Sequence, residues 1–496
     1  MMRMSRIISS LFLLLLVFVT AAAEDTVSSR GCRRGTLRPH NQLLRRSTAQ
    51  TRQPGGDFYK DNRHQLVVLA AFADKEFLGN ETATLEQWNH IFNTENYSEG
   101  SFKGSIPDYF YAQSYGKLNL TFDLVYVTVG NAVKYASDDT DENSQYLVQD
   151  IMAVLKQKTD IDWSRYDWNG DGFVNQLLIV YAGKGMNDNQ SATDLIWPHQ
   201  WWMSEHKKDR QEGVYCDPIP VTYSGKEYKV DCYCALSELG AAGDYSSFGV
   251  ICHEYTHCFG FPDFYYPGNY KTPDSWDIMD RGYYYSRAFC PVSYSAHERW
   301  LMGWLTPTEL TSASTVTSMP ALSAEPVAYI IRNGGYPQEY YMVENRQKSG
   351  WDAQLPGSGL VIFHVDFDAN TWTGVSGDWP NPGSNDRYLV FAANNQTYYD
   401  SNSGWPYPYS GNNELTNTSS PAATLNKANT DGTKLMSKPI TNIQVTGGLA
   451  SFDFMGGGPS SIQAPVSTSS LQVLYDIGPV RIVRMPNGEI KKVMKR

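Results

Sequence analysis

One short stretch carries residues whose types and spacing suit a metal site. His253-Glu254-Tyr255-Thr256-His257 is an HExxH sequence, with its two histidines four positions apart. On a helix this spacing puts both imidazoles on one face, where they can hold one zinc ion and leave room for a third ligand and a water. Glu254 is then placed to take the proton of the attacking water and return it to the leaving amine.

The residues that follow can supply the third ligand. Gly260 allows the helix to stop and turn, because glycine tolerates the left-handed conformation. Asp263, ten positions after His253, can then return beneath the metal with a carboxylate oxygen, which zinc accepts. Glu298 is the alternative third ligand, and its other interpretation is an exposed position on a helix.

The stretch HEYTHCFGFPDFY resembles the zinc site of the immune inhibitor A family of secreted metalloproteases, which belong with the metzincins. The family's HExxHxxGxPD pattern is kept, whereas the wider clan more often has histidine where this chain has Asp263. The resemblance implies a methionine turn beneath the ligands, and Met279 stands at that place; a plain packed core methionine is the alternative. One of Tyr283, Tyr284 and Tyr285 would donate to the oxyanion, as a tyrosine does in some metzincins, or else be structural.

A second stretch has oxygen-bearing residues at the spacing of a calcium loop. Gly172 provides the sharp turn of the first half of an EF-hand loop, but the twelfth position is Leu178 instead of glutamate. We therefore expect a structural calcium site completed by ligands elsewhere, and a metal-free Asp/Asn/Gly turn is the alternative. The expected ligands are Asp167, Asn169, Asp171, the backbone carbonyl of Phe173, and Asn175.

Length, charge and composition narrow the class of protein. The chain has 496 residues, enough for two or three domains. Its formal net charge of −11 argues against a nucleic-acid partner, which requires a basic face. Aromatic residues make up 13% and charged residues 19%, a composition typical of a folded extracellular protein. We expect a monomer that acts on protein or peptide substrates.

The N-terminus reads as an export signal followed by a pro-segment. Residues 1–23 combine an arginine-containing start, a short apolar run and three alanines, which is typical of a secretory signal peptide. No other segment is apolar for long enough to cross a membrane, so we expect a protein that is secreted or held at the cell surface. Residues 24–62 are basic and turn-rich, which indicates a pro-segment. Cys32 in this segment can cap the zinc of a latent form, or else is an unpaired linker cysteine.

The other cysteines gather around the HExxH stretch and fit an oxidising destination. Their even number allows three disulfides, but the connectivity does not follow from the sequence. They are Cys216, Cys232, Cys234, Cys252, Cys258 and Cys290.

The elements around these motifs predict an α/β catalytic domain, and the resemblance implies that this domain is of metzincin type. The apolar run 65–72 indicates a central strand, and the proline within 194–203 indicates an edge strand that can pair with an extended substrate. We place the catalytic domain at 63–310, a β-sandwich-like domain at 311–455, and a linker with a C-terminal tail at 456–496. Further expected elements are a helix at 105–116, a strand at 118–129, and helices at 143–158 and 295–305.

Together these features predict a secreted zinc endopeptidase that is made as a latent precursor. The rival from another class is a surface-binding protein that keeps the fold for adhesion, which would not need a base beside the metal. A zinc amidase or a glycan-acting hydrolase is a third interpretation, because the metal chemistry is shared.

Overall fold

The computed structural model describes residues 59–458 apart from 137–142, 189–193, 212, 246, 267, 270, 373–378 and 397–398, and beyond them the strands β17 to β20. The expected signal peptide and Cys32 lie outside the described residues, as does the pro-segment before residue 59.

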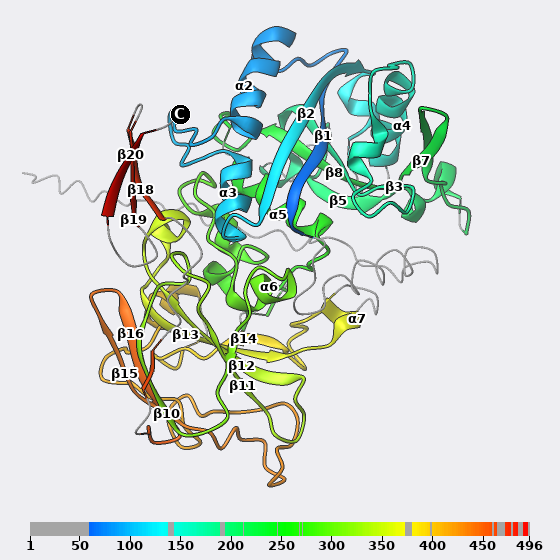
Figure 1. Ribbon diagram of the computed structural model, residues 1–496. Helices are drawn as coiled ribbons and strands as arrows, with labels where there is room; N and C mark the ends of the chain where they lie inside the picture. The colour runs from blue at the N-terminus through cyan, green and yellow to red at the C-terminus, as the bar shows by residue number, and fades with distance from the viewer. Residues whose placement is uncertain are drawn as a thin grey trace, which may run out of the picture.

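Strands from the first half of the chain form a five-stranded sheet (Figure 1). Its order is β2-β1-β4-β8-β5, and only β5 runs antiparallel to its neighbour. The expected central strand is confirmed, because β1 lies between β2 and β4 and its apolar run 66–72 is buried. The expected edge strand is also confirmed, because β5 ends the sheet. The strands are β1 Asp61–Phe72, β2 Leu118–Val129, β4 Leu177–Lys184, β5 His199–Trp202 and β8 Cys232–Leu239.

Four helices pack on this sheet: α2 Glu81–Asn93, α3 Ile106–Gln113, α4 Ser144–Leu155 and α5 Phe248–Cys258. The start of α3 follows from its sequence, because Ser105 and Asp108 form a capping box and Pro107 lies in the first turn. The N-cap residue of α5 is Ser247, and its side chain makes no capping hydrogen bond. Among the described residues, no helix has the length and apolar character needed to cross a bilayer.

The second half of the chain forms two further sheets. The middle sheet has the order β14-β13-β12-β11-β9 and the outer sheet the order β15-β16-β10-β17. The middle sheet consists of β9 Thr308–Glu309, β11 Tyr329–Arg332, β12 Glu339–Arg346, β13 Gly359–Asp366 and β14 Tyr388–Val390. The outer sheet consists of β10 Ser314–Met319, β15 Ile440–Thr446, β16 Leu449–Phe454 and β17 Ser461–Gln463.

Two smaller sheets complete the described strands. One consists of β3 Phe173–Val174, β6 Ile219–Tyr223 and β7 Lys226–Val230, and its strand β3 lies within the expected calcium loop 167–175. The other lies in the C-terminal region and consists of β18 Gln472–Ile477, β19 Val480–Arg484 and β20 Ile490–Met494.

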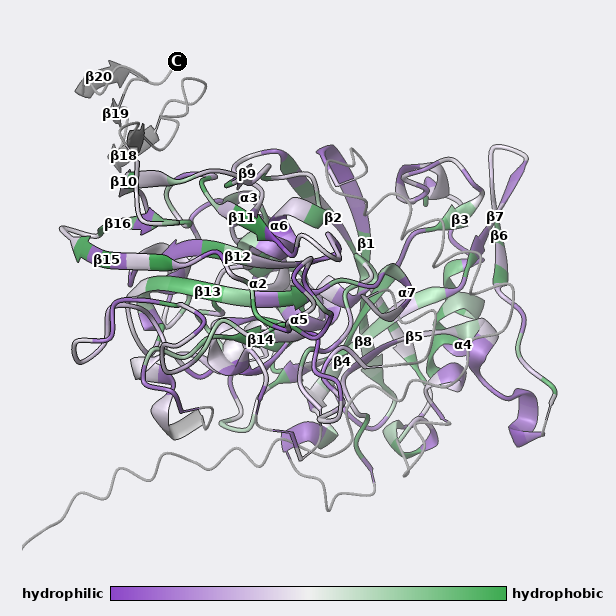
Figure 2. Cartoon of the chain, turned by 90° about the horizontal axis from the view of Figure 1, so that it is seen from below, coloured by the Kyte–Doolittle hydropathy of each residue, from purple (hydrophilic) through white to green (hydrophobic). Residues whose placement is uncertain are grey.

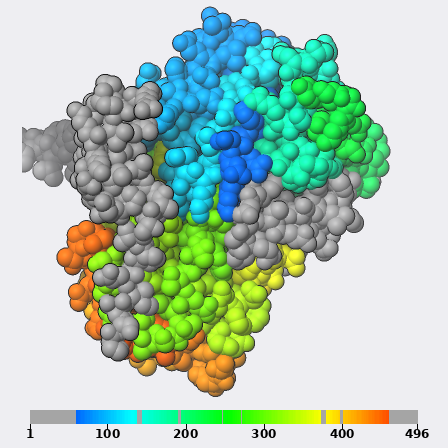
Figure 3. Space-filling view, in the orientation of Figure 1, coloured from blue at the N-terminus to red at the C-terminus, as the bar shows by residue number. Residues whose placement is uncertain are grey.

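The middle sheet is buried on both of its faces. Successive residues of its strands alternate between two hydrophobic clusters, so that Met342 packs with the first half of the chain and Val343 packs against the outer sheet. Every residue of β12 and β13 is buried, and β13 is largely apolar (Figure 2). The first cluster therefore continues past residue 310, where the sequence analysis places the catalytic boundary. In the space-filling view, the blue and cyan residues at the start of the described chain lie directly on the green residues that follow them (Figure 3).

A short helix, α6 Ala296–Leu301, lies where the two halves meet (Figure 1). It ends four residues earlier than the expected helix 295–305. Its His297 is fully buried among aromatic rings, and its Nδ1 lies 3.0 Å from the hydroxyl of Tyr340 on β12. Burial lowers the pKa of His297 to about 3, so the imidazole is neutral in the folded protein.

This neutral imidazole makes the protein sensitive to acid. Between about pH 6.5 and pH 3 the unfolded chain binds a proton that the folded chain does not, so the free energy of unfolding falls as the pH is lowered. In the variant His297→Phe, the free energy of unfolding should fall by about 1.4 kcal/mol less for each unit by which the pH is lowered in this range. Urea titrations at pH 7, 6 and 5 measure it, with His64→Gln at a partly exposed position as the control. An unchanged pH dependence in His297→Phe would contradict a neutral buried imidazole.

Candidate metal centre

Helix α5 and the turn after it bring the three expected metal ligands together. His253 and His257 lie on one face of α5, with ring centroids 4.8 Å apart, and both are buried. Gly260 has a φ of 87°, which a residue with a side chain rarely adopts, and its amide donates to the His257 carbonyl as the helix ends. The chain then turns back, so that Asp263 Oδ1 lies 3.2 Å from the Nε2 atom of each histidine.

Hydrogen bonds to backbone carbonyls fix which nitrogen of each histidine faces Asp263. The Nδ1 atom of His253 lies 2.7 Å from the Ile278 carbonyl, and that of His257 lies 2.7 Å from the Phe261 carbonyl. Because a carbonyl oxygen only accepts, Nδ1 carries the proton of each neutral ring and the lone pair is left on Nε2. Two such lone pairs converge on Asp263, whose carboxylate oxygens are buried without a hydrogen-bond partner among the described residues. This arrangement fits a bound metal cation.

Glu254 lies beside the ligands rather than among them. Its carboxylate belongs to a group with His253 and His257 whose potential ligand atoms lie within 4.8 Å of one another, yet its Oε2 is 3.9 Å from His257 Nε2. Asp263 approaches both histidines more closely than Glu254 does, which favours Asp263 as the third ligand. Burial raises the pKa of Glu254, although the two histidines partly oppose this effect. A carboxylate with a raised pKa at the edge of the cluster has the basicity needed to move protons.

Two of the expected ligands, His253 and Asp263, have pKa values shifted in opposite directions. Burial lowers the pKa of His253, but the neighbouring Asp263 and Glu254 outweigh this effect and raise it to about 9. Burial raises the pKa of Asp263, but His257 and His253 outweigh it, and the net pKa lies well below the usual range of an aspartate. A metal ion would therefore compete with a proton for His253 at neutral pH.

Glu298, the alternative third ligand, lies elsewhere and is not exposed as expected. It is fully buried, and its Oε2 accepts hydrogen bonds from the Ser295 amide (2.7 Å) and hydroxyl (3.0 Å). Ser295 caps α6 inside the core, so the carboxylate three residues later must turn back toward the cap. Burial raises the pKa of Glu298 well above the usual value, which favours its neutral form.

The expected methionine turn lies against the chain that carries Asp263. Met279 is fully buried, and its carbonyl accepts a hydrogen bond from the amide of Phe264, the residue after Asp263. Ile278, just before it, supplies the carbonyl that orients His253. Of the three candidate tyrosines, Tyr283 packs against an expected metal ligand: its ring centroid lies 4.4 Å from that of His253.

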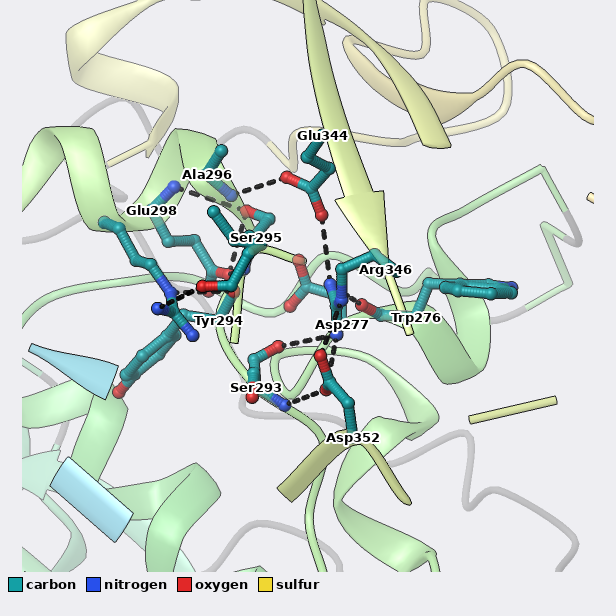
Figure 4. A network of polar contacts seen from close by, with 12 residues as sticks. Trp276, Asp277, Ser293, Tyr294, Ser295, Ala296, Glu298, Glu344, Arg346 and Asp352 are labelled. Carbon is teal, nitrogen blue, oxygen red and sulfur yellow. Dashed lines mark hydrogen bonds and ion pairs between the residues drawn. The ribbon is translucent and has the colours of Figure 1, made fainter. Parts of the chain in front are cut away.

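A buried ionic cluster from the second half of the chain, which was not predicted from the sequence, supports this turn (Figure 4). Arg346, at the end of β12, makes two hydrogen bonds to Asp352, at 2.8 and 2.9 Å, and one to Glu344, at 3.1 Å. It also donates to the carbonyls of Ser293 and Trp276, and the latter begins the methionine turn. The signal available in the sequence was a glutamate, an asparagine and an arginine, which directly follow the apolar run 340–343.

Asp277 connects the methionine turn to the second half of the chain through two hydrogen bonds. Its Oδ1 accepts a hydrogen bond from the Met279 amide at 2.8 Å, and its Oδ2 accepts one from the Tyr388 hydroxyl at 3.2 Å. These bonds fix the short segment that contains the Ile278 carbonyl. A chain of contacts therefore runs from Arg346 through Trp276 and this turn to the imidazole of His253.

The expected calcium ligands lie together in a tight loop. Asp167 accepts hydrogen bonds from the amides of Asp171 and Gly172, and the Asn169 amide group donates to Asp171 at 2.8 Å. Asn175 accepts from the Trp168 amide, and Phe173 begins β3. Lys226 holds its ammonium 3.9 Å from Asp167. These contacts hold the oxygen atoms of the loop in a fixed arrangement.

The assignment of Asp263 predicts how two acidic positions differ. Asp263→Asn should lower the zinc content of the purified protein from about one equivalent to well below half, because an amide is a poor zinc ligand. Glu298→Gln should keep its zinc, because its carboxylate serves the cap of α6. Metal analysis by mass spectrometry after gel filtration measures both variants. Loss of zinc from Glu298→Gln with retention in Asp263→Asn would reverse the assignment.

Comparison with known proteins identifies the protein family to which the chain is similar. Residues 57–301 match the model of the immune inhibitor A peptidase M6 catalytic domain. Immune inhibitor A of Bacillus thuringiensis subsp. alesti is 26% identical over 317 residues, covering 56% of this chain and 44% of that protein. The pre-pro-metalloprotease PrtV of Vibrio cholerae serotype O1 (strain M66-2) is 23% identical over 248 residues, covering 46% of this chain and 24% of that protein.

The chain thus spans less than half the length of these curated relatives. The matched region contains both histidines of α5, Glu254 and Asp263, and it ends with α6. On this match, the chain belongs to the immune inhibitor A family of M6 peptidases.

Proposed function

We propose that this chain is an exported zinc endopeptidase that hydrolyses peptide bonds of proteins. The observation that carries the proposal is the convergence of two imidazole Nε2 atoms on Asp263, with the Glu254 carboxylate 3.9 Å from one of them. A binding protein of the same fold would have no use for a base in that place, and membership of a peptidase family supports the same conclusion.

His253, His257 and Asp263 would hold the zinc ion. When bound, zinc supplies a Lewis acid that polarises the scissile carbonyl and lowers the pKa of water. Glu254 takes the proton of the attacking water on its carboxylate and then donates it to the leaving amine, for which its raised pKa is suited. The Tyr283 hydroxyl is the candidate donor to the oxyanion, because its ring packs on His253.

The edge strand β5 is the proposed docking site for the substrate. It pairs with β8 on one side and ends the sheet, so its other edge can accept an extended peptide as a further strand. Backbone hydrogen bonds of this kind do not depend on side chains. The enzyme should therefore accept many protein sequences.

The remaining parts of the proposal concern the organisation of the precursor. We propose a signal peptide at 1–23, a latency segment at 24–62 that contains Cys32, a metzincin-like catalytic domain at 63–310, a sandwich-like domain at 311–455 and a tail at 456–496, in a monomer. Two sheets that pack across one hydrophobic cluster support the sandwich. The mostly parallel first sheet, with an antiparallel strand at its edge, supports the metzincin-like placement.

The loop at 167–175 is the proposed calcium site. Asp167 is nearly buried, which keeps its carboxylate in place, whereas the Lys226 side chain is 57% exposed and can turn into solvent when a cation binds. Calcium at millimolar concentration should raise the thermal midpoint by about 2 to 5 °C, and Asp171→Asn should abolish the rise. Differential scanning calorimetry with calcium or magnesium measures it. An equal rise in Asp171→Asn would place the calcium elsewhere.

The decisive test of the enzyme is the replacement Glu254→Gln, which keeps the shape of the side chain but removes the base. Casein hydrolysis should fall about 10²- to 10⁴-fold in kcat/KM, while the zinc content stays near one equivalent. The exposed Glu227→Gln on β7 is the matched control and should retain activity. Chelator should abolish the activity of the native chain, and zinc should restore it. Activity that survives Glu254→Gln, or that is unaffected by chelator, would refute the mechanism.

A further inference from the structure

Three cysteine thiols meet between the zinc-site helix and the sheet. Cys258 is the last residue of α5, directly after His257, and its Sγ lies 3.3 Å from Sγ of Cys234 on β8. The neighbouring Cys258 thiol, together with burial, raises the pKa of the Cys232 thiol well above its usual value. Because Cys232 and Cys234 are two positions apart on one strand, their side chains leave from the same face, about 7 Å apart along it. Cys258 therefore has two neighbouring thiols.

The surroundings of these thiols tie them to the catalytic elements. The Cys234 thiol donates to the Glu254 carbonyl at 3.3 Å, and the Gln200 amide donates to Cys232 Sγ at 3.2 Å. Gln200 lies on β5, the proposed substrate edge, and pairs with Cys234 in the sheet. A covalent bond at this place would join the helix with the metal ligands to the strand beside the substrate edge.

We propose that Cys258 is the common partner of two alternative disulfides, one with Cys234 and one with Cys232. The oxidant is another disulfide, either low-molecular-weight or carried by an oxidoreductase. The Cys258 and Cys234 thiols give up two electrons and two protons, their S–S bond forms, the S–S bond of the oxidant breaks, and the oxidant leaves as two thiols. The link closes a loop of about 25 residues that includes α5.

The third thiol allows the link to move without further oxidation. Cys232, once deprotonated, attacks Cys258 Sγ, a Cys232–Cys258 bond forms, and Cys234 leaves as the thiolate and takes up a proton. Both forms hold the end of α5 on β8, and one cysteine of the three stays reduced in each. The inference rests on the proposed export to an oxidising compartment but not on peptide hydrolysis, so the two can fail separately.

The test maps the thiols of the full chain recovered from a bacterial periplasm. The protein is quenched in acid, alkylated with N-ethylmaleimide under denaturing conditions without reductant, digested and analysed by mass spectrometry. We expect Cys258 to be linked to Cys234 or Cys232, and one alkylated thiol among the three. Alkylation of all three, or a link from Cys258 to any other cysteine, would overturn the proposal.

Single replacements separate the two links. Cys232→Ser should leave only the Cys234 link, Cys234→Ser only the Cys232 link, and Cys258→Ser neither. Cys290→Ser is the matched control, because that thiol donates to the Trp351 carbonyl and lies outside the trio, so both links should persist.

Thermal unfolding gives a second readout. In chelator-treated protein, reduction with a phosphine should lower the midpoint by about 3 to 6 °C in the native chain and in Cys290→Ser, but not in Cys258→Ser. An equal decrease in Cys258→Ser would place the stabilising disulfide elsewhere.

Discussion

Two hydrogen bonds, from imidazole Nδ1 atoms to backbone carbonyls, are the interactions on which the candidate site depends. They fix the tautomer of His253 and His257, and with it the direction of the lone pairs that a metal needs. One carbonyl belongs to Phe261 in the turn after α5 and the other to Ile278 in the methionine turn. The orientation of the two imidazoles therefore depends both on the turn directly after α5 and on a segment about 20 residues further along the chain.

The methionine turn does not hold its shape alone. The Trp276 carbonyl, three residues before Met279, accepts a hydrogen bond from Arg346. The charge of Arg346 is balanced in the core by Glu344 and Asp352. A buried arginine is costly unless such partners surround it, so the loss of either acid would leave part of its charge unpaired in the core. The two acids and the arginine all lie beyond residue 301, where the match to the peptidase model ends.

The middle sheet explains how residues so late in the sequence reach the catalytic elements. Its strands are buried on both faces, because alternate residues pack toward the first half of the chain and toward the outer sheet. The second half is thus a layer beneath α6 and the methionine turn. A short helix such as α6 has little stability of its own, and burial against this sheet holds it in place.

Elements with local signals could be predicted from the order of the amino acids. The apolar run of β1, the capping box of α3, and the HExxH spacing with its glycine turn all follow from the periodicity and conformational preferences of neighbouring residues. The edge position of β5 followed from a proline that cannot donate to a sheet.

Tertiary structure alone decided the features that depend on residues distant in the chain. Glu298 was expected on the surface, because its neighbours do not reveal that α6 lies between two layers. The partners of Arg346 and the meeting of Cys258 with Cys232 and Cys234 depend on how helices and strands pack after they form. No pattern within one element encodes such contacts, because burial and pairing are properties of the assembled fold.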